Sequence, residues 1–536
     1  MSFHNGWGNR GENKHFTDVF DWCVRIQNSA KNYRRNMNGI RPERNSRRKQ
    51  MLSENSLPAI VIANVPRSPG KSSGSETRRA FLGHSSQAMA TTAAAFFPSH
   101  FLSGETSPRV HAAGSDEIRV ALIGCGGRGG GAAVDALSVA GAPLKIIALA
   151  DVFRERADVI QRSLREEFKE RIDLADGTPE ERIFVGFDAY KQAINCLRPG
   201  DIAIFATPPA FRAPQFAYAI EKGVHAFMEK PVSIDGPTTR QIIALAAKAD
   251  AKKLKVGVGL MCRHCDRRRE LWDRLQSGEA GELIAFRGYR EHNLAHNLDL
   301  APGPNGMSEL LWQVKRFHNF LWASGGVFSD YCIHHIDEVC WMKGSWPVRA
   351  EATGGRHYKG KLDDQNFDSY AIEYTFDDGA KFFYSSRLMN NCEQKFGVFG
   401  QGSKGAFTIS GSGHSPAKSV LYKSQRMDKN NILWAANQPE PNPYRREWEH
   451  LVAAIMADEP YNEAARGAQA SLATAMGRFA AHTGQPVTYD EMLNSQDDLT
   501  AGVASLTADS PSILVANSDG TYPVPSPGKY KFEYRN

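Results

Sequence analysis

Between residues 118 and 260, short apolar runs alternate with amphipathic stretches. The runs contain few polar positions, which is typical of strands that are buried on both faces. They occupy residues 118–123, 145–150, 201–206, 224–228 and 255–260. The stretch 213–222 has helical spacing and ends at Gly223. Strands that alternate with helices predict a doubly wound parallel sheet.

The pattern changes after residue 263. A helix predicted over 266–277 leads into strands that have one apolar and one polar face and no helices between them. These strands are predicted over 283–291, 348–353, 370–376 and 380–385, with Asp377-Asp378-Gly379 as a hairpin turn. Such a series predicts an antiparallel sheet. Two helices over 448–456 and 469–483 are expected to pack back onto this sheet.

A glycine-rich loop, Gly124-Cys125-Gly126-Gly127-Arg128-Gly129, directly follows the first strand. Glycines allow a sharp turn and a close approach of bare backbone to a pyrophosphate, and the next helix offers unpaired N–H groups. The second strand ends at Asp151, 27 residues after Gly124, where a carboxylate can bind ribose hydroxyls. A carboxylate also repels a 2′-phosphate, which favours NAD(H), although nearby Arg154 keeps NADP(H) as an alternative. Asp151 could instead be an ordinary helix N-cap.

The N-terminal region has the features of an export signal. Thr77-Arg78-Arg79-Ala80-Phe81-Leu82-Gly83 precedes an apolar run over 88–97, and this pair resembles a twin-arginine translocation signal. A helix needs about 20 apolar residues to span a bilayer, so the run predicts a cleavable segment rather than an anchor. We expect cleavage between Phe97 and Gly114; a basic linker is the alternative. Residues 1–75 lack periodicity and are a long extension or precede a true start at Met51.

Charge and cysteine content narrow the class of protein. Residues 1–113 contain 16 Lys and Arg against 7 Asp and Glu, whereas the remainder contains 49 against 52. The basic character therefore belongs to the leader, and the rest gives no electrostatic reason to expect a nucleic-acid partner. The eight cysteines are scattered, which predicts buried thiols rather than disulfides. Cys262-Arg263-His264-Cys265 is a lone C-x-x-C, and we predict no metal there.

Two motifs about 100 residues apart carry a family resemblance. Glu229-Lys230-Pro231 directly follows the predicted strand 224–228, and the segment 325–337 contains two glycines followed by Asp330, His334 and Asp337. With the glycine loop and Thr207-Pro208, these motifs resemble the Gfo/Idh/MocA oxidoreductases, which include glucose–fructose oxidoreductase and inositol dehydrogenases. The likeness covers about residues 117–485 and is greatest to a secreted subgroup that carries the twin-arginine signal.

The resemblance implies which residues bind the nicotinamide cofactor. They lie at the carboxyl ends of the predicted parallel strands: Gly124, Gly126, Gly127, Arg128, Gly129, Asp151, Thr207, Pro208, Glu229, Lys230 and Pro231. Two positions in the turn near the cofactor differ from the family pattern, since Pro209 replaces an Asn and Arg212 replaces a His.

Together, the patterns and the resemblance predict an α/β chain with an N-terminal Rossmann dinucleotide-binding domain and a C-terminal α+β domain with a large, mainly antiparallel sheet. A chain of 536 residues is too long for one hydrophobic core. We expect a disordered basic N-terminal extension (1–75), a signal peptide and linker (76–113), a Rossmann domain (114–262), a substrate-binding and catalytic domain (263–485) and a C-terminal tail (486–536).

The catalytic residues that the resemblance implies are Lys230, Asp330 and His334. Removal of hydride from a carbinol carbon requires that the hydroxyl proton also leave, and histidine is a base suited to that transfer. Asp330, His334 and Asp337 are spaced so that a helix places them on one face, whereas His335 points elsewhere and is expected to be structural. Lys230 could stabilise alkoxide charge, and Asp330 could orient the imidazole or bind a substrate hydroxyl.

Aromatic and polar residues alternate over 312–322, just before the catalytic segment. Rings pack against the C–H faces of sugars while polar groups bind hydroxyls, so this segment is a candidate substrate surface. The candidates are Trp312, His318, Trp322, Arg290, His292 and His296. At least half of the aromatic residues are nevertheless expected to be core.

The predicted function is a nicotinamide-dependent oxidoreductase that acts on a CH–OH group of a carbohydrate or polyol. Because free NAD is not expected outside the cytoplasm, an exported enzyme should hold NAD(H) tightly. An NAD-dependent glycosidase or lyase that works through transient oxidation is the enzymatic alternative, and an inactive sugar-binding protein is the alternative of another class. Expected partners are a small carbohydrate, the twin-arginine translocase and a second copy of the chain. The expected location is the periplasm or another destination reached by twin-arginine export.

Overall fold

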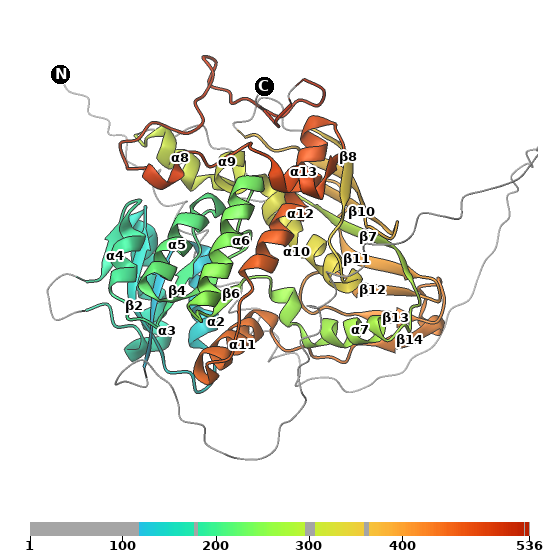
Figure 1. The fold of residues 1–536 in the computed structure, drawn as a ribbon, viewed down its shortest axis with the longest axis horizontal. Helices are drawn as coiled ribbons and strands as arrows, with labels where there is room; N and C mark the ends of the chain where they lie inside the picture. The colour runs from blue at the N-terminus through green and yellow to red at the C-terminus, as the bar shows by residue number, and fades with distance from the viewer. Residues whose placement is uncertain (1–116, 176–180, 295–305, 358–363, 530, 535–536) are drawn as a thin grey trace, which may run out of the picture. The chain divides into compact units, whose positions relative to one another are not determined.

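The computed structural model describes residues 117–175, 181–294, 306–357, 364–529 and 531–534 (Figure 1). The predicted N-terminal extension, signal peptide and linker lie outside the described residues, and so does His296. Within the described ranges, no helix is both long enough and apolar enough to cross a membrane.

The first sheet, sheet A, has six parallel strands in the order β3-β2-β1-β4-β5-β6. They are β1 (Ile118–Ile123), β2 (Leu144–Asp151), β3 (Ile183–Val185), β4 (Ile202–Phe205), β5 (His225–Met228) and β6 (Val256–Val258). This order is the Rossmann order, in which the chain crosses from one half of the sheet to the other between β3 and β4. The predicted parallel sheet is confirmed.

Helices cover both faces of sheet A. The five helices that are near it in sequence are α2 (Gly127–Leu137), α3 (Arg154–Phe168), α4 (Ala189–Asn195), α5 (Arg212–Lys222) and α6 (Gly236–Ala251). Alternate residues of β1 divide between two hydrophobic clusters: Leu122 packs with α2 and α3, and Ile123 packs with α4, α5 and α6. Both faces are therefore apolar, as the continuous apolar runs indicate.

Two late helices complete the core of sheet A, although both were predicted to pack on the second sheet. Helix α11 (Pro443–Ala457) stacks Trp448 on Phe227 of β5, with ring centroids 4.4 Å apart. Helix α12 (Ala464–Thr483) contributes alanines to the core of sheet A and Leu472 and Met476 to the core of the second sheet. The prediction is wrong for α11 and half right for α12, because helical periodicity does not reveal which sheet an apolar face will cover.

The second sheet has nine strands in the order β14-β13-β12-β11-β7-β10-β9-β8-β15. They are β7 (Leu283–His292), β8 (Arg349–Gly355), β9 (Ser369–Thr375), β10 (Lys381–Leu388), β11 (Lys395–Gly402), β12 (Ala406–Ser410), β13 (Val420–Tyr422), β14 (Ile432–Ala435) and β15 (Val487–Thr488). Every pairing is antiparallel except β7 with β10. The predicted, mainly antiparallel sheet is confirmed.

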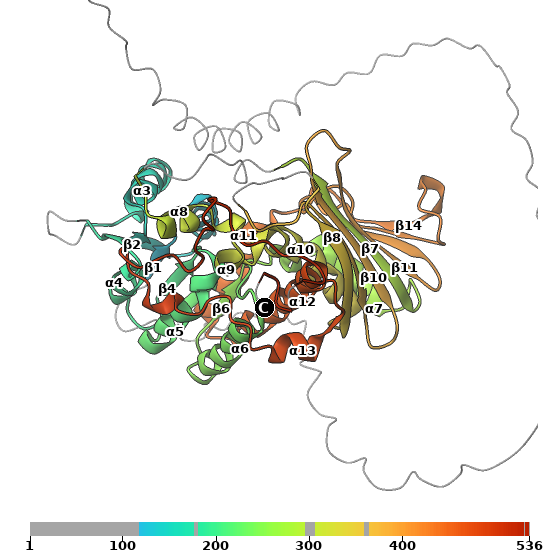
Figure 2. The same cartoon turned by 90° about the horizontal axis from the view of Figure 1, so that it is seen from above.

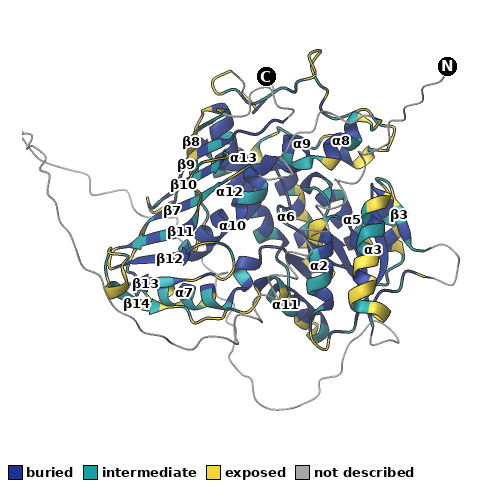
Figure 3. Ribbon diagram, turned by 180° about the vertical axis from the view of Figure 1, so that it is seen from behind, coloured by how far each residue is buried: buried dark blue, intermediate teal, exposed yellow. Residues whose placement is uncertain are grey.

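Helix α10 (Gly326–Lys343) lies between the two sheets and beside α12, as two perpendicular views show (Figures 1 and 2). Ile333 belongs to the hydrophobic cluster of sheet A, whereas Phe328 and Ile336 belong to that of the second sheet. A helix that contacts apolar groups on opposite sides must be buried nearly all round, and α10 is coloured mostly as buried in Figure 3. Its polar side chains therefore need partners inside the protein.

Shorter elements surround these layers. They are η1 (Lys169–Arg171), η2 (Pro209–Phe211), η3 (Met261–His264), α7 (Asp266–Gln276), α8 (Glu309–Lys315), η5 (Phe317–Asn319), α9 (Leu321–Ser324), η6 (Lys429–Asn431), α13 (Tyr489–Asn494) and η7 (Val503–Ser505).

The stretch after residue 485, expected to be a tail, is packed against the rest of the fold. It supplies β15 to the edge of the second sheet and α13 beside it. Leu499, Leu514 and Tyr522 join a hydrophobic cluster with residues of α8 and α9. Near the end of the chain, Glu533 is buried and forms an ion pair with Arg478 of α12, with a 2.8 Å N–O distance. The polar composition of this stretch concealed its few anchoring residues.

Candidate active site

The glycine loop makes a turn that only glycine can make. Gly124 has a φ of +93°, and a Cβ atom there would lie 2.6 Å from the carbonyl carbon of Ala206. A Cβ at Gly129 would lie 1.9 Å from the carbonyl oxygen of Gly124. These two glycines thus allow β1, β4 and the start of α2 to approach one another closely.

Gly126 differs, because a Cβ there would meet no atom within 4 Å. It is the N-cap of α2, which has no side-chain cap and no acidic residue in its first turn. Gly127 opens that turn. Open space in front of uncapped N–H groups is suited to an anion such as a pyrophosphate, so the loop fits a dinucleotide.

Asp151 lies at the end of β2 and fixes the loop. Its carboxylate accepts hydrogen bonds from the N–H groups of Cys125 (2.7 Å) and Phe153 (2.9 Å). Burial raises its pKa, against the opposing effect of Arg156 and these backbone donors. Arg154, the residue that kept NADP(H) open, bonds Asp158 at 2.9 Å.

Arg128 and Glu229 form a brace between α2 and the end of β5. Arg128 donates through Nε to Glu229 at 3.1 Å and through Nη2 at a shorter distance, and its guanidinium lies 5.1 Å from the centre of the Tyr444 ring. Glu229 is almost fully buried. Both residues were predicted to bind the cofactor. In the structure, their side chains form an ion pair with each other.

The Thr207-Pro208 turn lies beside the glycine loop and is held from within. Thr207 donates its hydroxyl to Gln215 at 2.7 Å. Arg212, which stands where the family often has a His, is buried and donates to the carbonyl oxygens of Phe205 and of Thr207, the latter at 2.8 Å. Its side chain therefore serves the backbone of the turn.

Lys230 joins the two halves of the molecule. It follows β5 and precedes Pro231 through a cis peptide bond. Its Nζ donates to the carbonyl oxygen of Asp330 at 2.7 Å and to that residue's carboxylate at 3.2 Å. The other carboxylate oxygen of Asp330 lies 3.0 Å from Nε2 of His318. The Lys230 ammonium, the Asp330 carboxylate and the His318 imidazole thus form one chain of contacts.

The charge state of Asp330 follows from these partners. Burial alone would raise its pKa, but the charge on Lys230 and the hydrogen bond with His318 hold that pKa well below its usual range. Asp330 is therefore ionised at neutral pH. It bonds Lys230 and His318 rather than His334, so the expectation that it orients the imidazole of His334 is not met.

His334 lies one turn after Asp330 on α10. Its Nδ1 is buried without a hydrogen-bond partner, and Nε2 also has no hydrogen-bond partner among the described residues. Burial, together with the proximity of His414, Lys230 and Arg290, lowers its pKa well below the ordinary value. A neutral imidazole with an unbonded nitrogen can accept a proton.

The sequence analysis missed His414, which lies in the loop between β12 and β13. Its ring centroid is 4.5 Å from that of His334, and its Nε2 is 3.0 Å from Nη1 of Arg290. Glu338 lies on the other side of the ring, with Oε1 3.7 Å from Nδ1. No local motif marks His414. Its loop is far from α10 in sequence, and the folding of the second sheet brings the two together.

Two family profiles match this chain. The profile of the oxidoreductase family with an NAD-binding Rossmann fold matches residues 118–260, and that of the GFO/IDH/MocA C-terminal domain matches residues 269–408. Together they match more than half of the chain. The chain belongs to the Gfo/Idh/MocA oxidoreductase family.

Among curated relatives, an inositol 2-dehydrogenase of Corynebacterium glutamicum is 27% identical over 152 residues, which are 28% of this chain and 37% of that protein. A glycosyl hydrolase family 109 protein of Shewanella pealeana is 25% identical over 221 residues, 40% of this chain and 44% of that protein. The matched segments thus span less than half the length of these relatives.

Solved structures share the fold. A scyllo-inositol dehydrogenase from Lactobacillus casei with bound NAD(H) and scyllo-inositol superposes with a TM-score of 0.51 at 20% identity, over 70% of this chain and 99% of that chain. An aldose-aldose oxidoreductase from Caulobacter crescentus superposes with a TM-score of 0.52 at 17% identity, over 69% and 99%.

In this family member, the two candidate tryptophans are core residues. Trp322 is fully buried and donates its indole N–H to Gln313 at 2.7 Å. Trp312 packs against Phe320 and Tyr522, with centroids 5.3 and 6.1 Å away. The expectation that they contact substrate is therefore corrected: the segment after residue 485 covers them, which the local sequence could not show.

Two further polar residues of α10 have structural partners. Asp337 is buried and accepts three hydrogen bonds of 2.8–3.0 Å from Arg263. His335 lies 3.1 Å from the hydroxyl of Tyr384. His292, another predicted pocket residue, stacks on Tyr331 at 5.8 Å.

Cys262 of the C-x-x-C lies near Glu338 and His414, and atoms of the three residues are within 4.8 Å of one another. Metal binding through Nδ1 of His414 would leave the imidazole proton on Nε2, facing a guanidinium that is itself a donor. Glu338 also faces Arg268 at 3.3 Å. Hydrogen bonds and ion pairs thus account for this set.

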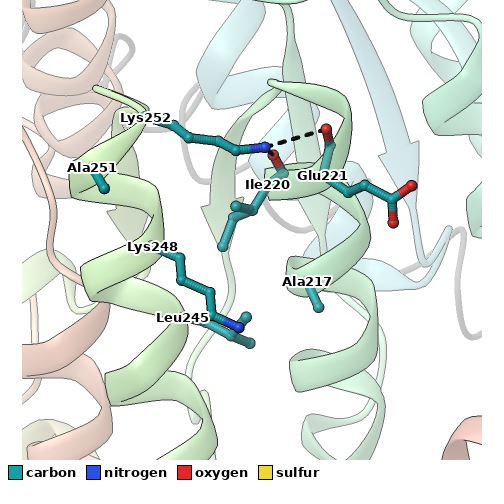
Figure 4. Close-up of a pocket in the computed structure, with 7 residues that line it drawn as sticks. All are labelled: Ala217, Ile220, Glu221, Leu245, Lys248, Ala251 and Lys252. Atoms are coloured by element: carbon teal, nitrogen blue, oxygen red, sulfur yellow. Dashed lines mark hydrogen bonds between the residues drawn. The ribbon is translucent and has the colours of Figure 1, made fainter.

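A cavity of about 390 Å³ lies elsewhere, between α5 and α6 (Figure 4). It is lined by Ala217, Ile220, Glu221, Leu245, Lys248, Ala251 and Lys252. Lys252 donates to the carbonyl oxygen of Ile220 at 2.7 Å and thereby caps the end of α5. None of the predicted site residues lines this cavity.

Proposed function

We propose that this protein is a nicotinamide-dependent oxidoreductase that acts on a CH–OH group of a sugar or polyol and holds NAD(H) tightly. The observation that carries the proposal is the convergence of Lys230, from the end of sheet A, with Asp330 and His334 of α10. Inositol 2-dehydrogenases among the relatives, and a structural neighbour with bound NAD(H) and scyllo-inositol, support a polyol or sugar.

The glycine loop and the N-terminus of α2 would hold the pyrophosphate, and Asp151 would receive the adenosine ribose. Each Asp151 oxygen accepts one backbone hydrogen bond, which leaves lone pairs for ribose hydroxyls. Its negative charge favours NAD(H) over a 2′-phosphorylated cofactor. The nicotinamide would supply the hydride acceptor.

The side chains divide the remaining work. His334 takes the hydroxyl proton on Nε2, which is ready at neutral pH because its depressed pKa keeps the ring neutral. Lys230 stabilises negative charge that develops on the substrate oxygen. Asp330 holds the ammonium of Lys230 in place and, with His318, can accept or donate to a neighbouring substrate hydroxyl.

We also propose export through the twin-arginine route, on the basis of the Arg78-Arg79 motif and its apolar run. That route carries folded proteins, so a tightly held cofactor could travel with the chain. Association with a second copy stays a prediction from the resemblance.

A glycosidase that oxidises transiently is the second candidate, favoured by the glycosyl hydrolase family 109 relative. It would use the same lysine and histidine, but each cycle would return the cofactor to its starting state. Release of a glycoside's leaving group without net reduction of the cofactor would identify it.

The experiment begins with mass spectrometry of denatured, purified protein. We expect NAD(H) near one per chain. Addition of polyols and sugars should then change the absorbance of the bound nicotinamide. Cofactor that never changes with any sugar would contradict the oxidoreductase and favour a binding protein, and a chain that binds no nicotinamide would contradict both enzymatic proposals.

A further inference from the structure

Arg290 lies on β7, on the face of the second sheet that α10 covers. Its guanidinium lies over two aromatic rings, 4.5 Å from the centre of Phe396 and 5.4 Å from that of Tyr331. The hydrogen-bond partner of Nη1 is Nε2 of His414 at 3.0 Å. Contact with two rings restricts the guanidinium and leaves its N–H groups to make hydrogen bonds.

This guanidinium has no counter-ion in the described part of the chain. It forms no ion pair with a carboxylate there, and its one protein hydrogen bond is to a neutral ring. Its Nε is buried without a partner, and Nη2 has no hydrogen-bond partner among the described residues, although the side chain as a whole is only half-buried. An arginine that lies over two rings, is half-buried and has no counter-ion among the described residues is suited to bind an anion.

The charges around Arg290 balance without it. Lys230 pairs with Asp330 at 3.2 Å, and Arg268 pairs with Glu338 at 3.3 Å. Burial lowers the pKa of His414 to about 4, and His334 is also neutral at pH 7. The positive charge of Arg290 is therefore a surplus inside a largely buried site, where an unpaired charge is costly.

Arg290 is also near the groups proposed to react. The ring of His414 contacts both Arg290 and His334. Tyr331, which stacks on Arg290, directly follows Asp330 and meets the ring of His318 at 5.8 Å. A substrate that reaches His334 and Asp330 would thus have Arg290 within the span of a sugar ring and its substituents.

We propose that Arg290 binds an anionic substituent of the substrate, a carboxylate or a sulfate ester, so that the site takes an acidic sugar or polyol in preference to a neutral one. The inference rests on the proposed function for its location but concerns recognition, which can be measured without turnover. A planar guanidinium edge matches the two oxygens of either anion.

The test is calorimetric titration of the purified protein, with its bound cofactor, using matched sugars. Glucose, glucuronate and glucose 6-sulfate form one set, and the corresponding galactose compounds form another. We expect at least one acidic member to bind about 10- to 100-fold more tightly than its neutral partner, because a charged hydrogen bond is worth about 1.5–3 kcal/mol. Added salt should weaken only the acidic ligand.

Two variants assign the effect to Arg290. Arg290→Gln keeps a donor for His414 and should remove the preference, whereas Arg290→Lys should keep part of it. Arg287→Gln is the matched control, because Arg287 lies on the same strand but on the opposite face and contacts Met427. It should bind like the wild type.

The outcomes separate the two proposals. Equal or tighter binding of the neutral sugars, an acidic preference that survives Arg290→Gln, or no binding of any acidic member overturns the role of Arg290 and leaves the oxidoreductase proposal intact if neutral sugars are oxidised. Tight, Arg290-dependent binding of an acid without any change in the nicotinamide supports the role of Arg290 while contradicting the oxidoreductase. The relative affinities for the uronate and for the sulfate ester identify which anion Arg290 binds.

Discussion

The carboxyl edge of sheet A and the inner face of the second sheet build their parts of the site by different means. At the edge of sheet A, the cofactor region consists of bare backbone: a glycine loop, an uncapped helix N-terminus and one carboxylate that braces them. Across from it, the proposed substrate region consists of charged and aromatic side chains from α10, β7, η5 and a distant loop. Lys230 is the contact between them.

The difference shows what each region must recognise. A pyrophosphate is the same in every cofactor, so a short contiguous motif with fixed backbone suffices. A substrate varies among relatives, and side chains drawn from many elements can be exchanged without changing the fold. Substitutions that change the backbone geometry should therefore weaken cofactor binding. Substitutions that remove single side-chain groups should weaken substrate recognition.

The largest effect is expected at the junction. Lys230→Ala and His334→Ala should each lower kcat by about 10³-fold, because a positioned proton acceptor or charge contributes on that order. Cofactor content by mass spectrometry should stay at the wild-type level. Turnover at the wild-type rate in either variant would mean that the two regions do not form one catalytic site.

The substrate region depends on distant anchors, and Glu533→Gln tests one of them. Arg478 binds Glu533 and also donates to Ser329 and to the carbonyl oxygen of Gly325 at the start of α10. Removal of the carboxylate leaves a buried guanidinium, which should cost about 3 kcal/mol in unfolding free energy measured with urea. Glu373→Gln, in a half-exposed pair with Lys381, is the control and should change little.

Two glycines of the cofactor region should respond differently. Gly126→Ala adds a methyl group to open space, so the unfolding midpoint should hold while affinity for NAD(H) falls about 10- to 100-fold through lost backbone hydrogen bonds. Gly129→Ala forces a methyl group against the Gly124 carbonyl and should lower stability as well. Unchanged cofactor content in Gly126→Ala would contradict the predicted pyrophosphate site.

The smallest effect is a pH dependence of stability. His414 has its pKa lowered to about 4 in the folded protein, against an ordinary value of about 6.5 in the unfolded chain. Below pH 6.5 the unfolded chain therefore binds more protons at His414 than the folded protein does. The neutral His414 stabilises the folded protein fully above that pH, and this stabilisation is lost as the pH falls. Between pH about 7.5 and about 5, wild type should lose roughly 2 kcal/mol more than His414→Gln. If urea titrations show that the wild type and His414→Gln lose the same unfolding free energy, the pKa of His414 is not lowered in the folded protein.

Much of the cofactor region was predictable because its determinants are local. The glycine loop, Asp151 and the Thr207-Pro208 turn each follow an apolar run that predicts a buried strand, and parallel strands bring their carboxyl ends to one edge. The structure still changed some roles within it. Arg128 and Glu229 form an ion pair. They are about 100 residues apart in the sequence, so no local pattern could predict this contact.

The substrate region was predicted in part. Asp330, His334 and His318 were named as candidates. In the structure, Asp330 contacts Lys230 and His318. His334 contacts His414, which in turn contacts Arg290. Trp312 and Trp322 were named for the same reason, an aromatic and polar alternation, but they pack in a core that the last residues of the chain complete. Aromatic residues serve packing and recognition equally well, so the pattern could not separate the two.

The sequence alone determined that there is one parallel sheet and one mainly antiparallel sheet, together with the motifs at the edge of sheet A, because periodicity and turn residues act within a few positions of one another. Only the tertiary structure decided which sheet α11 covers, which carboxylate meets which cation, and that His414 contacts both His334 and Arg290. Those contacts depend on burial and charge balance between segments far apart in the chain, and such balance exists only once the segments have packed together.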